Sequence, residues 1–292
     1  MATVTVNYNR PGDTAELINS IKKSDLSESV LLVIDNGSTD NSLDILRKSF
    51  PNINIVETGR NLGFASGYNF GMNSALETDA EAILIINNDT LVPPSFLLPL
   101  LKTLESSPSV GAVSPKTYQA DGKHIWWAGG KIDLSFGRLI NIGAGKLDSD
   151  QFNKIVECDY LSGVCILFKR EVLEKVGLFD ERFVHTCEDD DIAIRIRKAG
   201  YKLLMVPESK LIHKVSQTSG GEYSSFHLYS LEKYRLLLMK KWGYWQGLLT
   251  LIKLGPLFIR RLGGAFIRGH GLTSALAMLR GWRDGIFYEK SA

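Results

Sequence analysis

Two acidic segments, about one hundred residues apart, carry the clearest chemistry in this sequence. Asn87-Asn88-Asp89 follows the apolar run 82–86, which predicts a buried strand that ends in a carboxylate. The segment 188–191, Glu-Asp-Asp-Asp, is the densest acidic cluster and opens a predicted helix. A carboxylate at a strand end suits a divalent cation, because hard cations prefer oxygen ligands and a diphosphate can supply the others. Together the two segments predict group transfer from a phosphorylated donor.

Each acidic segment also has a structural interpretation. Asn87-Asn88-Asp89 can be a polar strand end with a helix cap before the prolines at 93 and 94. Acids at a helix N-terminus are favourable on structural grounds alone. Four in a row exceed that need, and their repulsion and partial burial would raise a carboxyl pKa, which would suit a general base.

Two further segments follow predicted strands and favour nucleotide binding. In the segment 35–40, Asp35 can accept hydrogen bonds from a ribose or a base at the carboxyl end of a parallel strand. In the segment 60–69, backbone N–H groups can face a phosphate, and Gly63 and Gly67 permit close approach. The structural alternatives are a turn with a helix cap for the first segment and helix–sheet packing by the glycines for the second.

Aromatic and histidine side chains supply weaker signals. His213 follows a predicted strand and can complete a metal site or contact a phosphate. Trp126 and Trp127, next to two glycines, can form a platform for a sugar ring, with core packing as the alternative.

Strand and helix signals alternate through the first half of the chain. Strands are predicted at 3–7, 30–34, 53–56, 82–86 and 110–113, and helices at 11–23, 42–50, 63–76 and 94–104. This alternation predicts a mostly parallel sheet with helices on both faces. Glycine-rich antiparallel ribbons and loops are predicted from 115 to 158. A strand at 163–168, helices at 170–176 and 189–199, and a strand at 202–206 that ends at Pro207 complete the predicted core.

The charge distribution sets the end of the chain apart. From Leu231 onward there are 11 Lys and Arg residues and 3 Asp and Glu residues, a balance of +8, against −6 for the rest of the chain. Apolar, aromatic and basic residues at helical spacing predict an amphipathic pair of helices beyond Trp242 that lies on an anionic membrane surface. The alternative is a packing arm or a homodimer contact. No run of about 18–20 apolar residues predicts a spanning helix.

The remaining features of the sequence predict a cytoplasmic protein. The chain begins with a strand-like segment and shows no secretory signal. Its three cysteines lack a CxxC pair and predict reduced thiols. We expect the protein on the inner face of the cell membrane, with no nucleic-acid partner.

In combination and order, these segments resemble glycosyltransferase family 2, the inverting enzymes of GT-A fold. The segments that carry the resemblance are 4–10, 35–40, 60–69, 87–89 and 188–200, within roughly residues 3 to 240. Asn87-Asn88-Asp89 resembles the Asp-x-Asp metal motif in the variant form of rhamnosyltransferase-like members. The first acid of that motif is Asn87 here, so metal affinity would rest on Asp89 and His213.

The resemblance implies the domains and the roles of individual residues. It implies a GT-A catalytic domain at 1–222, with a nucleotide-sugar half at 1–115 and an acceptor half at 116–222, followed by a basic helical tail at 223–292. Asp189 would be the catalytic base, and Asp89 and His213 would hold Mg²⁺ or Mn²⁺. The residues expected to contact the nucleotide-sugar are Asn7, Asn9, Asp35, Asn36, Arg60, Gly63, Asn69 and Asn88. Those expected to contact the acceptor are Trp127, Gly163, Glu188 and Asp191.

The implied reaction is a single displacement with inversion at the anomeric carbon. The resemblance favours dTDP-rhamnose as the donor, with a UDP-hexose next, and a cell-surface or lipid-linked glycan as the acceptor. A non-catalytic binding module for nucleotide sugars is one alternative. A sugar nucleotidyltransferase is another, but it should carry a glycine-rich, arginine-containing loop after the first strand, where this chain has the segment 8–13.

Overall fold

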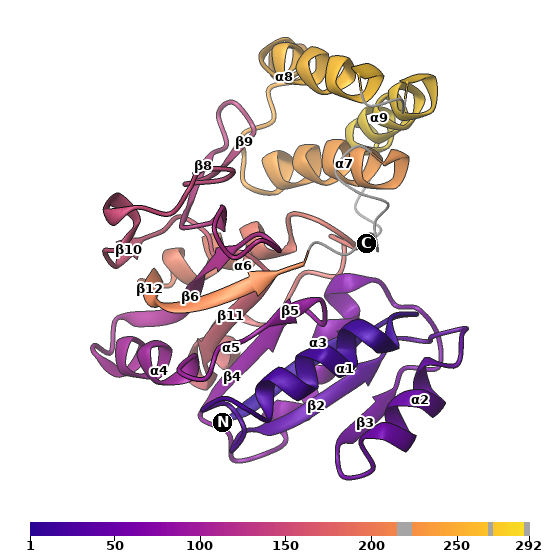
Figure 1. Ribbon diagram of the computed structural model, residues 1–292. Coiled ribbons are helices and arrows are strands. Elements are labelled where there is room, and N and C mark those ends of the chain that lie inside the picture. The colour runs from indigo at the N-terminus through magenta and orange to yellow at the C-terminus, as the bar shows by residue number, and fades with distance from the viewer. Residues whose placement is uncertain (215–223, 268–270, 289–292) are drawn as a thin grey trace. The chain divides into compact units, whose positions relative to one another are not determined.

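The computed structural model describes residues 1–214, 224–267 and 271–288 (Figure 1). Its strands, in chain order, are β1 (Ala2–Asn7), β2 (Val30–Asp35), β3 (Asn54–Glu57), β4 (Ala82–Ile86), β5 (Thr90–Leu91), β6 (Val110–Tyr118), β7 (Ile125–Trp127), β8 (Gly130–Asp133), β9 (Arg138–Asn141), β10 (Val156–Glu157), β11 (Cys165–Lys169) and β12 (Lys202–His213). Its helices are α1 (Pro11–Ile21), α2 (Ser42–Ser49), α3 (Phe64–Leu76), α4 (Leu97–Glu105), α5 (Arg170–Val176), α6 (Glu188–Lys198), α7 (Ser225–Lys241), α8 (Leu248–Ile267) and α9 (Gly271–Ile286), with a 3-10 turn at Asp150–Phe152.

The main sheet is mixed and has the order β10-β12-β6-β11-β4-β1-β2-β3. Pairing is parallel through β4, β1, β2 and β3, and also between β6 and β12. Strand β11 runs antiparallel between β4 and β6. Because the parallel strands end at one edge, the polar residues that follow β1, β2 and β4 are brought to that edge.

Helices cover both faces of this sheet, as predicted. On one face, apolar side chains of α1 and α4 form a single buried cluster with β4, and α2 packs beside them. Helix α3 lies on the other face, against β1 and β2. A Cβ added at Gly71 of α3 would lie 2.3 Å from Val4 Cγ1, and one at Gly67 would lie 3.0 Å from Asn36 Nδ2. At both positions a larger side chain would crowd these neighbours, so glycine lets α3 approach the sheet closely. This agrees with the structural alternative for the segment, which was helix–sheet packing by the glycines.

The predicted end of a strand at Pro207 is wrong. Strand β12 continues from Lys202 to His213, and its pairing with β6 shifts register between Val206 and Lys210. Proline lacks the N–H that a ladder needs, so it is tolerated where a bulge interrupts the pairing. The continuation carries His213 to β5, where it pairs with Thr90.

The chain forms two compact units. The first comprises residues 1–131, 141–184 and 188–214, and the second comprises Ile132–Ile140, His185–Cys187 and the described residues from Ser224 on. The predicted boundary at 222/223 lies in the segment 215–223, outside the described residues. The predicted division at 115/116 falls inside β6.

The second unit is held together by close packing of α7 and α9 and by a buried carboxylate. A Cβ at Gly281 would lie 2.6 Å from the carbonyl oxygen of Tyr229, so only glycine permits this approach. The buried Glu232 accepts hydrogen bonds from Arg261 Nη1 at 2.9 Å and Trp282 Nε1 at 2.7 Å, which joins all three helices. Among the residues that the structure describes, no helix has the length and apolar character needed to cross a membrane.

Candidate active site

The ends of β1 and β2 are joined by hydrogen bonds to Asp35. This buried carboxylate accepts from Asn7 Nδ2 at 2.8 Å, Ser38 Oγ at 2.7 Å and Ser38 N at 3.0 Å. Asn9, with a positive φ of 53°, accepts at Oδ1 from the Thr39 N–H at 2.8 Å. The loop after β2 is therefore held against the end of β1. A carboxylate oxygen has further lone pairs, so Asp35 can still accept a bond from a ribose or base.

Thr14 of α1 connects this loop to the segment after β4. Its hydroxyl donates to Asn7 Oδ1 at 2.8 Å and accepts from Asn88 Nδ2 at 3.0 Å. The structure thus brings together three residues predicted to contact the nucleotide-sugar: Asn7, Asp35 and Asn88. Thr14 was not predicted, and its only sequence signal is a polar residue on the otherwise apolar face of α1.

Two backbone N–H groups at the start of α3 have protein acceptors. Gly63 N donates to Asn61 Oδ1 at 2.8 Å, and Phe64 N donates to the Val184 carbonyl at 3.0 Å. Asn36 is also engaged here, because it donates to the Gly63 carbonyl and accepts from Leu62 N, both at 3.0 Å. The N–H groups of residues 63 and 64 are therefore used to shape the loop.

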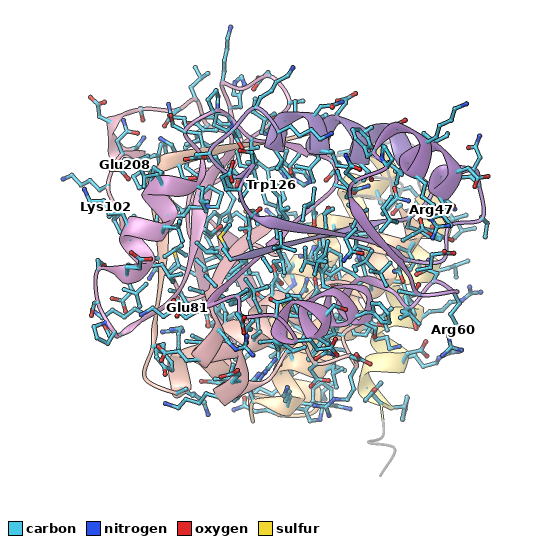
Figure 2. The ribbon with its side chains drawn as sticks, turned by 90° about the horizontal axis from the view of Figure 1, so that it is seen from below. Arg47, Arg60, Glu81, Lys102, Trp126 and Glu208 are labelled. Atoms are coloured by element: carbon cyan, nitrogen blue, oxygen red, sulfur yellow. The ribbon has the colours of Figure 1, made fainter. Side chains whose placement is uncertain are left out.

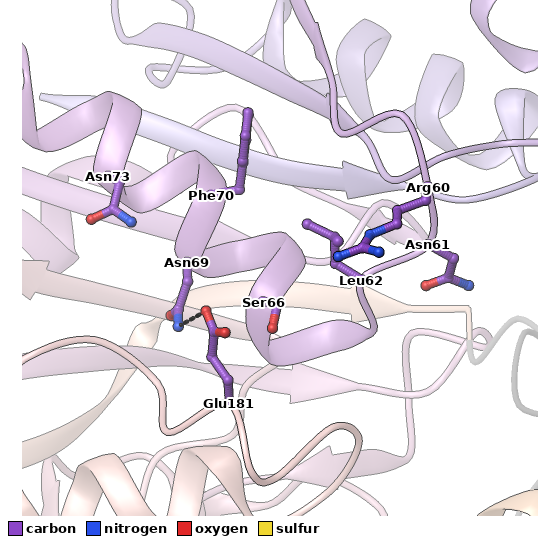
Figure 3. Close-up of a pocket in the computed structure, with 8 residues that line it drawn as sticks. All are labelled: Arg60, Asn61, Leu62, Ser66, Asn69, Phe70, Asn73 and Glu181. Carbon is purple, nitrogen blue, oxygen red and sulfur yellow. Dashed lines mark hydrogen bonds between the residues drawn. The ribbon is translucent and has the colours of Figure 1, made fainter.

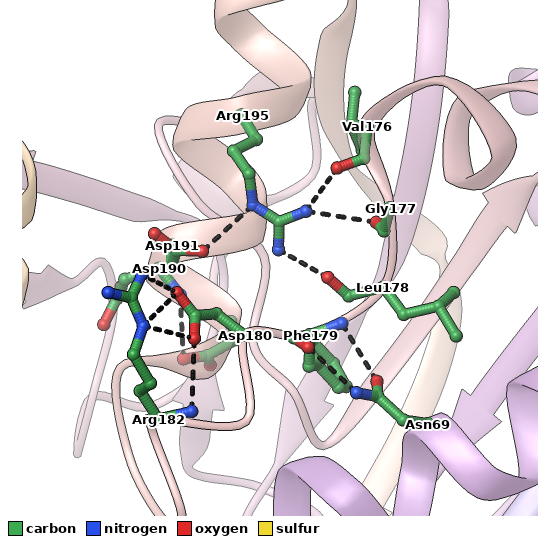
Figure 4. Close-up of polar contacts among 11 residues, drawn as sticks. Asn69, Val176, Gly177, Leu178, Phe179, Asp180, Arg182, Asp190, Asp191 and Arg195 are labelled. Carbon is green, nitrogen blue, oxygen red and sulfur yellow. Dashed lines mark hydrogen bonds and ion pairs between the residues drawn. The ribbon is translucent and has the colours of Figure 1, made fainter. Parts of the chain in front are cut away.

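Asn69, predicted to contact the donor, joins α3 to the loop at 179–181. Its Nδ2 donates to the Phe179 carbonyl at 2.8 Å and to Glu181 Oε1 at 3.0 Å, and its Oδ1 accepts from Phe179 N at 2.9 Å (Figures 3 and 4). These bonds use both ends of the buried amide, so in this arrangement Asn69 positions the loop.

A pocket of about 470 Å³ lies beside α3. Its lining consists of Arg60, Asn61, Leu62, Ser66, Asn69, Phe70, Asn73 and Glu181 (Figure 3). Arg60 is exposed and lies at the edge of the molecule in the view of Figure 2. Neither Asp89 nor Asp189 lines this pocket, which therefore differs from the place where the acidic segments meet.

Asp89 and His213 form a buried pair. Asp89 Oδ1 lies 3.2 Å from His213 Nε2, and less than a tenth of either side chain is exposed. The ring of Trp126 meets the imidazole edge-on, with centroids 4.7 Å apart. His213 Nδ1 is buried and has no hydrogen-bond partner in the described part of the chain.

This pair fits two ligands of a divalent cation, one oxygen and one nitrogen. No group of three or more His, Cys, Asp or Glu residues suited to a metal occurs within the described ranges. The remaining ligands would therefore have to come from a bound diphosphate or water.

Tyr68, which the sequence did not single out, contacts the same segment. Its buried phenol donates to Asn87 Oδ1 at 3.0 Å. Burial, and then the charge of Asp89, raise the pKa of this phenol well above its usual value. Tyr68 therefore keeps its proton and remains a hydrogen-bond donor.

Asp189 is held at the start of α6 by backbone N–H groups. Its Oδ2 accepts from Gly163 N at 2.9 Å and its Oδ1 accepts from Asp190 N at 3.0 Å. Burial raises the pKa of this half-buried carboxyl, although the hydrogen bonds act in the opposite direction. An aspartate with a raised pKa is a stronger base than an exposed one.

The two acidic segments are connected through residues 163 and 164. Gly163 donates to Asp189, and the carbonyl of Val164 accepts from Asn87 N at 2.8 Å. The pairing of Cys165 with Ile86 in the sheet fixes this connection. Asp189 and the segment 87–89 therefore lie at the same end of β4.

Asp191 has a different environment from Asp189. It is fully buried, and its Oδ2 accepts from Arg195 Nε at 3.0 Å. The other guanidinium nitrogens of Arg195 donate to the carbonyls of residues 176–178 (Figure 4). Asp191 therefore takes part in fixing α6 to the end of α5. Glu188 is also buried.

Trp127 is fully buried in β7, and its ring centroid is 6.5 Å from that of Tyr160. This position favours the core-packing alternative over a sugar platform. Trp126 is half-buried and contacts His213.

Sequence comparisons relate this chain to one protein family. Residues 3–177 match the model of a family described as glycosyl transferase family 2. An N-acetylglucosaminyl-diphospho-decaprenol L-rhamnosyltransferase of Mycobacterium tuberculosis is 25% identical over 280 residues, covering 89% of this chain and 91% of that protein. A dTDP-rhamnosyl transferase, RfbF, of Shigella flexneri is 22% identical over 193 residues, covering 65% of this chain and 61% of that protein.

Solved structures show the same fold. A mannosyltransferase of Pyrobaculum calidifontis, in complex with GDP-Man and Mn²⁺, superposes with a TM-score of 0.60 at 17% identity, covering 99% of this chain and 87% of that one. GalNAc-T7, with UDP, GalNAc and Mn²⁺, gives a TM-score of 0.60 at 16% identity over 80% of this chain. This chain spans about half (47%) of that structure. The fold is GT-A, as predicted.

Proposed function

This chain belongs to glycosyltransferase family 2 and is a glycosyltransferase, and we propose that it moves a sugar from a nucleoside-diphosphate donor to a glycan hydroxyl. In this proposal the configuration of the anomeric carbon is inverted. The observation that carries this proposal is the hydrogen-bonded connection from Asp189 through residues 163 and 164 to Asn87. It supports the proposal because it holds the Asp189 carboxyl, whose pKa is raised by burial, at the end of β4, where the segment 87–89 would meet a diphosphate.

In the proposed reaction Asp189 accepts the proton of the acceptor hydroxyl. The acceptor oxygen forms a bond to the anomeric carbon as the bond from that carbon to the diphosphate oxygen breaks. The nucleoside diphosphate leaves with the electron pair. A single base is sufficient, because attack and departure occur in one displacement on opposite sides of the carbon.

Asp89 and His213 would hold Mg²⁺ or Mn²⁺. Such an ion would supply positive charge to the diphosphate as negative charge develops on it. The buried His213 Nδ1 and the 3.2 Å separation of the pair support a site of this chemistry. Asn7, Asp35 and Asn88 would hold the nucleoside end of the donor through the network that Thr14 joins.

We favour dTDP-rhamnose as the donor, with a UDP-hexose next. The Mycobacterium and Shigella relatives, which are named for rhamnosyl transfer, support this order. The acceptor in the proposal is a lipid-linked or cell-surface glycan.

A lipid-linked acceptor would place the enzyme on the inner face of the cell membrane. Helix α8 supports this, because its outward face carries Leu248, Ile252, Ile259 and Phe266 at helical spacing, with Arg260 among them. An exposed apolar stripe with interspersed cations suits an anionic lipid surface. A homodimer contact through the same face is the competing explanation.

The proposal is tested by supplying dTDP-rhamnose, UDP-glucose and GDP-mannose separately, with Mn²⁺ and a polyprenyl-diphosphate-linked glycan. We expect release of nucleoside diphosphate to depend on the acceptor and to be fastest with dTDP-rhamnose. We also expect NMR of the product to show an inverted anomeric centre. Binding of donor without any transfer would indicate a non-catalytic module, and a retained configuration would contradict the single displacement.

A further inference from the structure

The pocket beside α3 is formed by one face of that helix and by two loops. Four lining residues stand at positions i, i+3, i+4 and i+7 of α3 and therefore share a face: Ser66, Asn69, Phe70 and Asn73. Arg60 belongs to the loop that precedes the helix, and Glu181 belongs to the loop at 179–181 (Figure 3). Asn69 is buried, whereas Arg60, Phe70 and Glu181 are exposed. The pocket is therefore open to solvent and accessible to a ligand.

This face of α3 is not the one that meets the segment 87–89. Tyr68, whose phenol donates to Asn87 Oδ1, lies two positions from both Ser66 and Phe70. Because each residue turns an α-helix by about 100°, Tyr68 is on the opposite side of the helix from the pocket. The pocket is therefore separate from the place proposed for the diphosphate.

Polar groups of the lining keep hydrogen-bonding capacity for a ligand. In the part of the chain that the structure describes, the Arg60 guanidinium and the Asn73 amide have no hydrogen-bond or ion-pair partner. Glu181 uses Oε1 to accept from Asn69 Nδ2 at 3.0 Å and keeps Oε2 as a further acceptor. The lining therefore offers both donors and acceptors, and the positive charge of Arg60 is balanced by the negative charge of Glu181.

These groups match an uncharged ligand that carries several hydroxyl groups. A hydroxyl both donates and accepts, so it can pair with a guanidinium, an amide or a carboxylate. A phosphate would instead require an excess of positive charge, which Glu181 cancels here. Phe70, which is 37% exposed, adds an aromatic face, and the negative face of such a ring attracts the C–H groups of a sugar. The volume of about 470 Å³ is within the range of about 300–1,000 Å³ typical of small-molecule sites.

We propose that this pocket binds neutral sugar units of a glycan chain. The ring of Phe70 packs against the sugar, and Arg60, Asn73 and Glu181 exchange hydrogen bonds with its hydroxyl groups. This inference goes beyond the proposed transfer, because the pocket contains neither of the two aspartates that act in the proposed reaction. A second point of attachment would keep the enzyme on a glycan between transfers, since binding at two linked sites raises the overall affinity.

The test is saturation-transfer NMR of the full-length protein, titrated with chitobiose, maltose and methyl α-rhamnoside as neutral probes. We expect at least one probe to bind in the millimolar range and to receive magnetisation at its C–H protons. Phe70→Ala and Asn73→Ala should each weaken that binding about 3- to 10-fold, the range for loss of one aromatic contact or one hydrogen bond. Phe70→Tyr keeps the ring and should bind the probe as wild type does.

Two matched variants and one competitor serve as controls. Phe136→Ala removes an aromatic ring that is 43% exposed, and Asn52→Ala removes an exposed amide, both outside the pocket. We expect both variants to bind the probe as wild type does. Because Arg60 and Asn69 are also expected to contact the donor, the titration is repeated with an excess of dTDP. We expect dTDP to leave probe binding unchanged.

Three results would overturn the inference. One is a wild-type protein that binds none of the probes. The second is wild-type affinity for the probe in both Phe70→Ala and Asn73→Ala. The third is displacement of the probe by dTDP, which would make the pocket part of the donor site. Absence of transfer in a protein that still binds the probe through Phe70 would instead contradict the proposed function alone.

Discussion

Asp191 and Arg195 form an ion pair across one turn of α6, with 3.0 Å between Oδ2 and Nε. The same guanidinium donates to three consecutive backbone carbonyls at the end of α5. One planar side chain therefore connects two helices and neutralises a buried carboxylate. This arrangement uses Asp191 to hold α6 against the end of α5, whereas in the proposed reaction Asp189 of the same cluster is the base.

The first prediction concerns Arg195→Lys. Lysine keeps the charge but has no planar fork, so most of these hydrogen bonds would be lost. We expect the free energy of unfolding to fall by about 2–4 kcal/mol, in the range for disruption of a buried ion pair. Urea denaturation followed by circular dichroism measures this change.

Arg197→Lys is the matched control for that measurement. Arg197 lies on the same helix, but it is nearly half exposed and pairs with Asp159 at 3.1 Å. Exposed ion pairs contribute about 0–1 kcal/mol, so we expect little change. Equal destabilisation by the two variants would show that Arg195 has no special role.

The second prediction concerns pH. In the proposed reaction transfer requires ionised Asp189, and burial raises the pKa of this carboxyl. Activity should therefore be lost as pH falls through that raised pKa, at a pH above the ordinary aspartate value of about 3.9. The measurement is kcat/KM against pH for the donor, with saturating Mn²⁺. An acidic limb at or below the ordinary value would show that a different group acts as base.

The third prediction concerns the apolar face of α8. Ile252 and Ile259 are 63% and 68% exposed on that face. We expect Ile252→Glu combined with Ile259→Glu to reduce recovery of the protein with phosphatidylglycerol vesicles about tenfold or more, because two apolar contacts are lost and two negative charges are added. Flotation on a density gradient measures the bound fraction.

Leu98→Glu is the control for membrane binding, since Leu98 is equally exposed on α4. We expect its flotation to match that of wild type. If wild type does not float, and the α8 variant converts a dimer to a monomer in sedimentation experiments, the face is a dimer contact instead.

Much of the first unit was predictable from sequence because its strands are continuous apolar runs followed directly by polar residues. Residues 82–86 are buried without exception, and the adjacent segment 87–89 lies at the sheet edge as expected. The predicted strand end at Pro207 was wrong, because a bulge in the pairing with β6 lets the strand continue past the proline. Tertiary pairing therefore outweighs the local signal of the proline.

The parts of the site that escaped prediction are hydrogen bonds between distant positions. Thr14 and Asn88 are 74 residues apart, and Asn69 and Phe179 are 110 apart. A sequence shows residue types but not which amide faces a ligand and which one closes a loop. The donor contact expected of Asn69 stays a prediction, and the structure adds that both ends of its amide hold the loop at 179–181.

The most direct test of the account is the turnover of Asp189→Asn with saturating donor, Mn²⁺ and acceptor, measured alongside donor affinity. Asparagine preserves the size of the side chain but cannot accept the proton. We predict that kcat falls by about 10² to 10⁴, the usual contribution of a general base, while the donor Kd changes less than about three-fold. Asp150→Asn, at an exposed position, should leave both unchanged. Wild-type turnover by Asp189→Asn would contradict the assignment of Asp189 as the base.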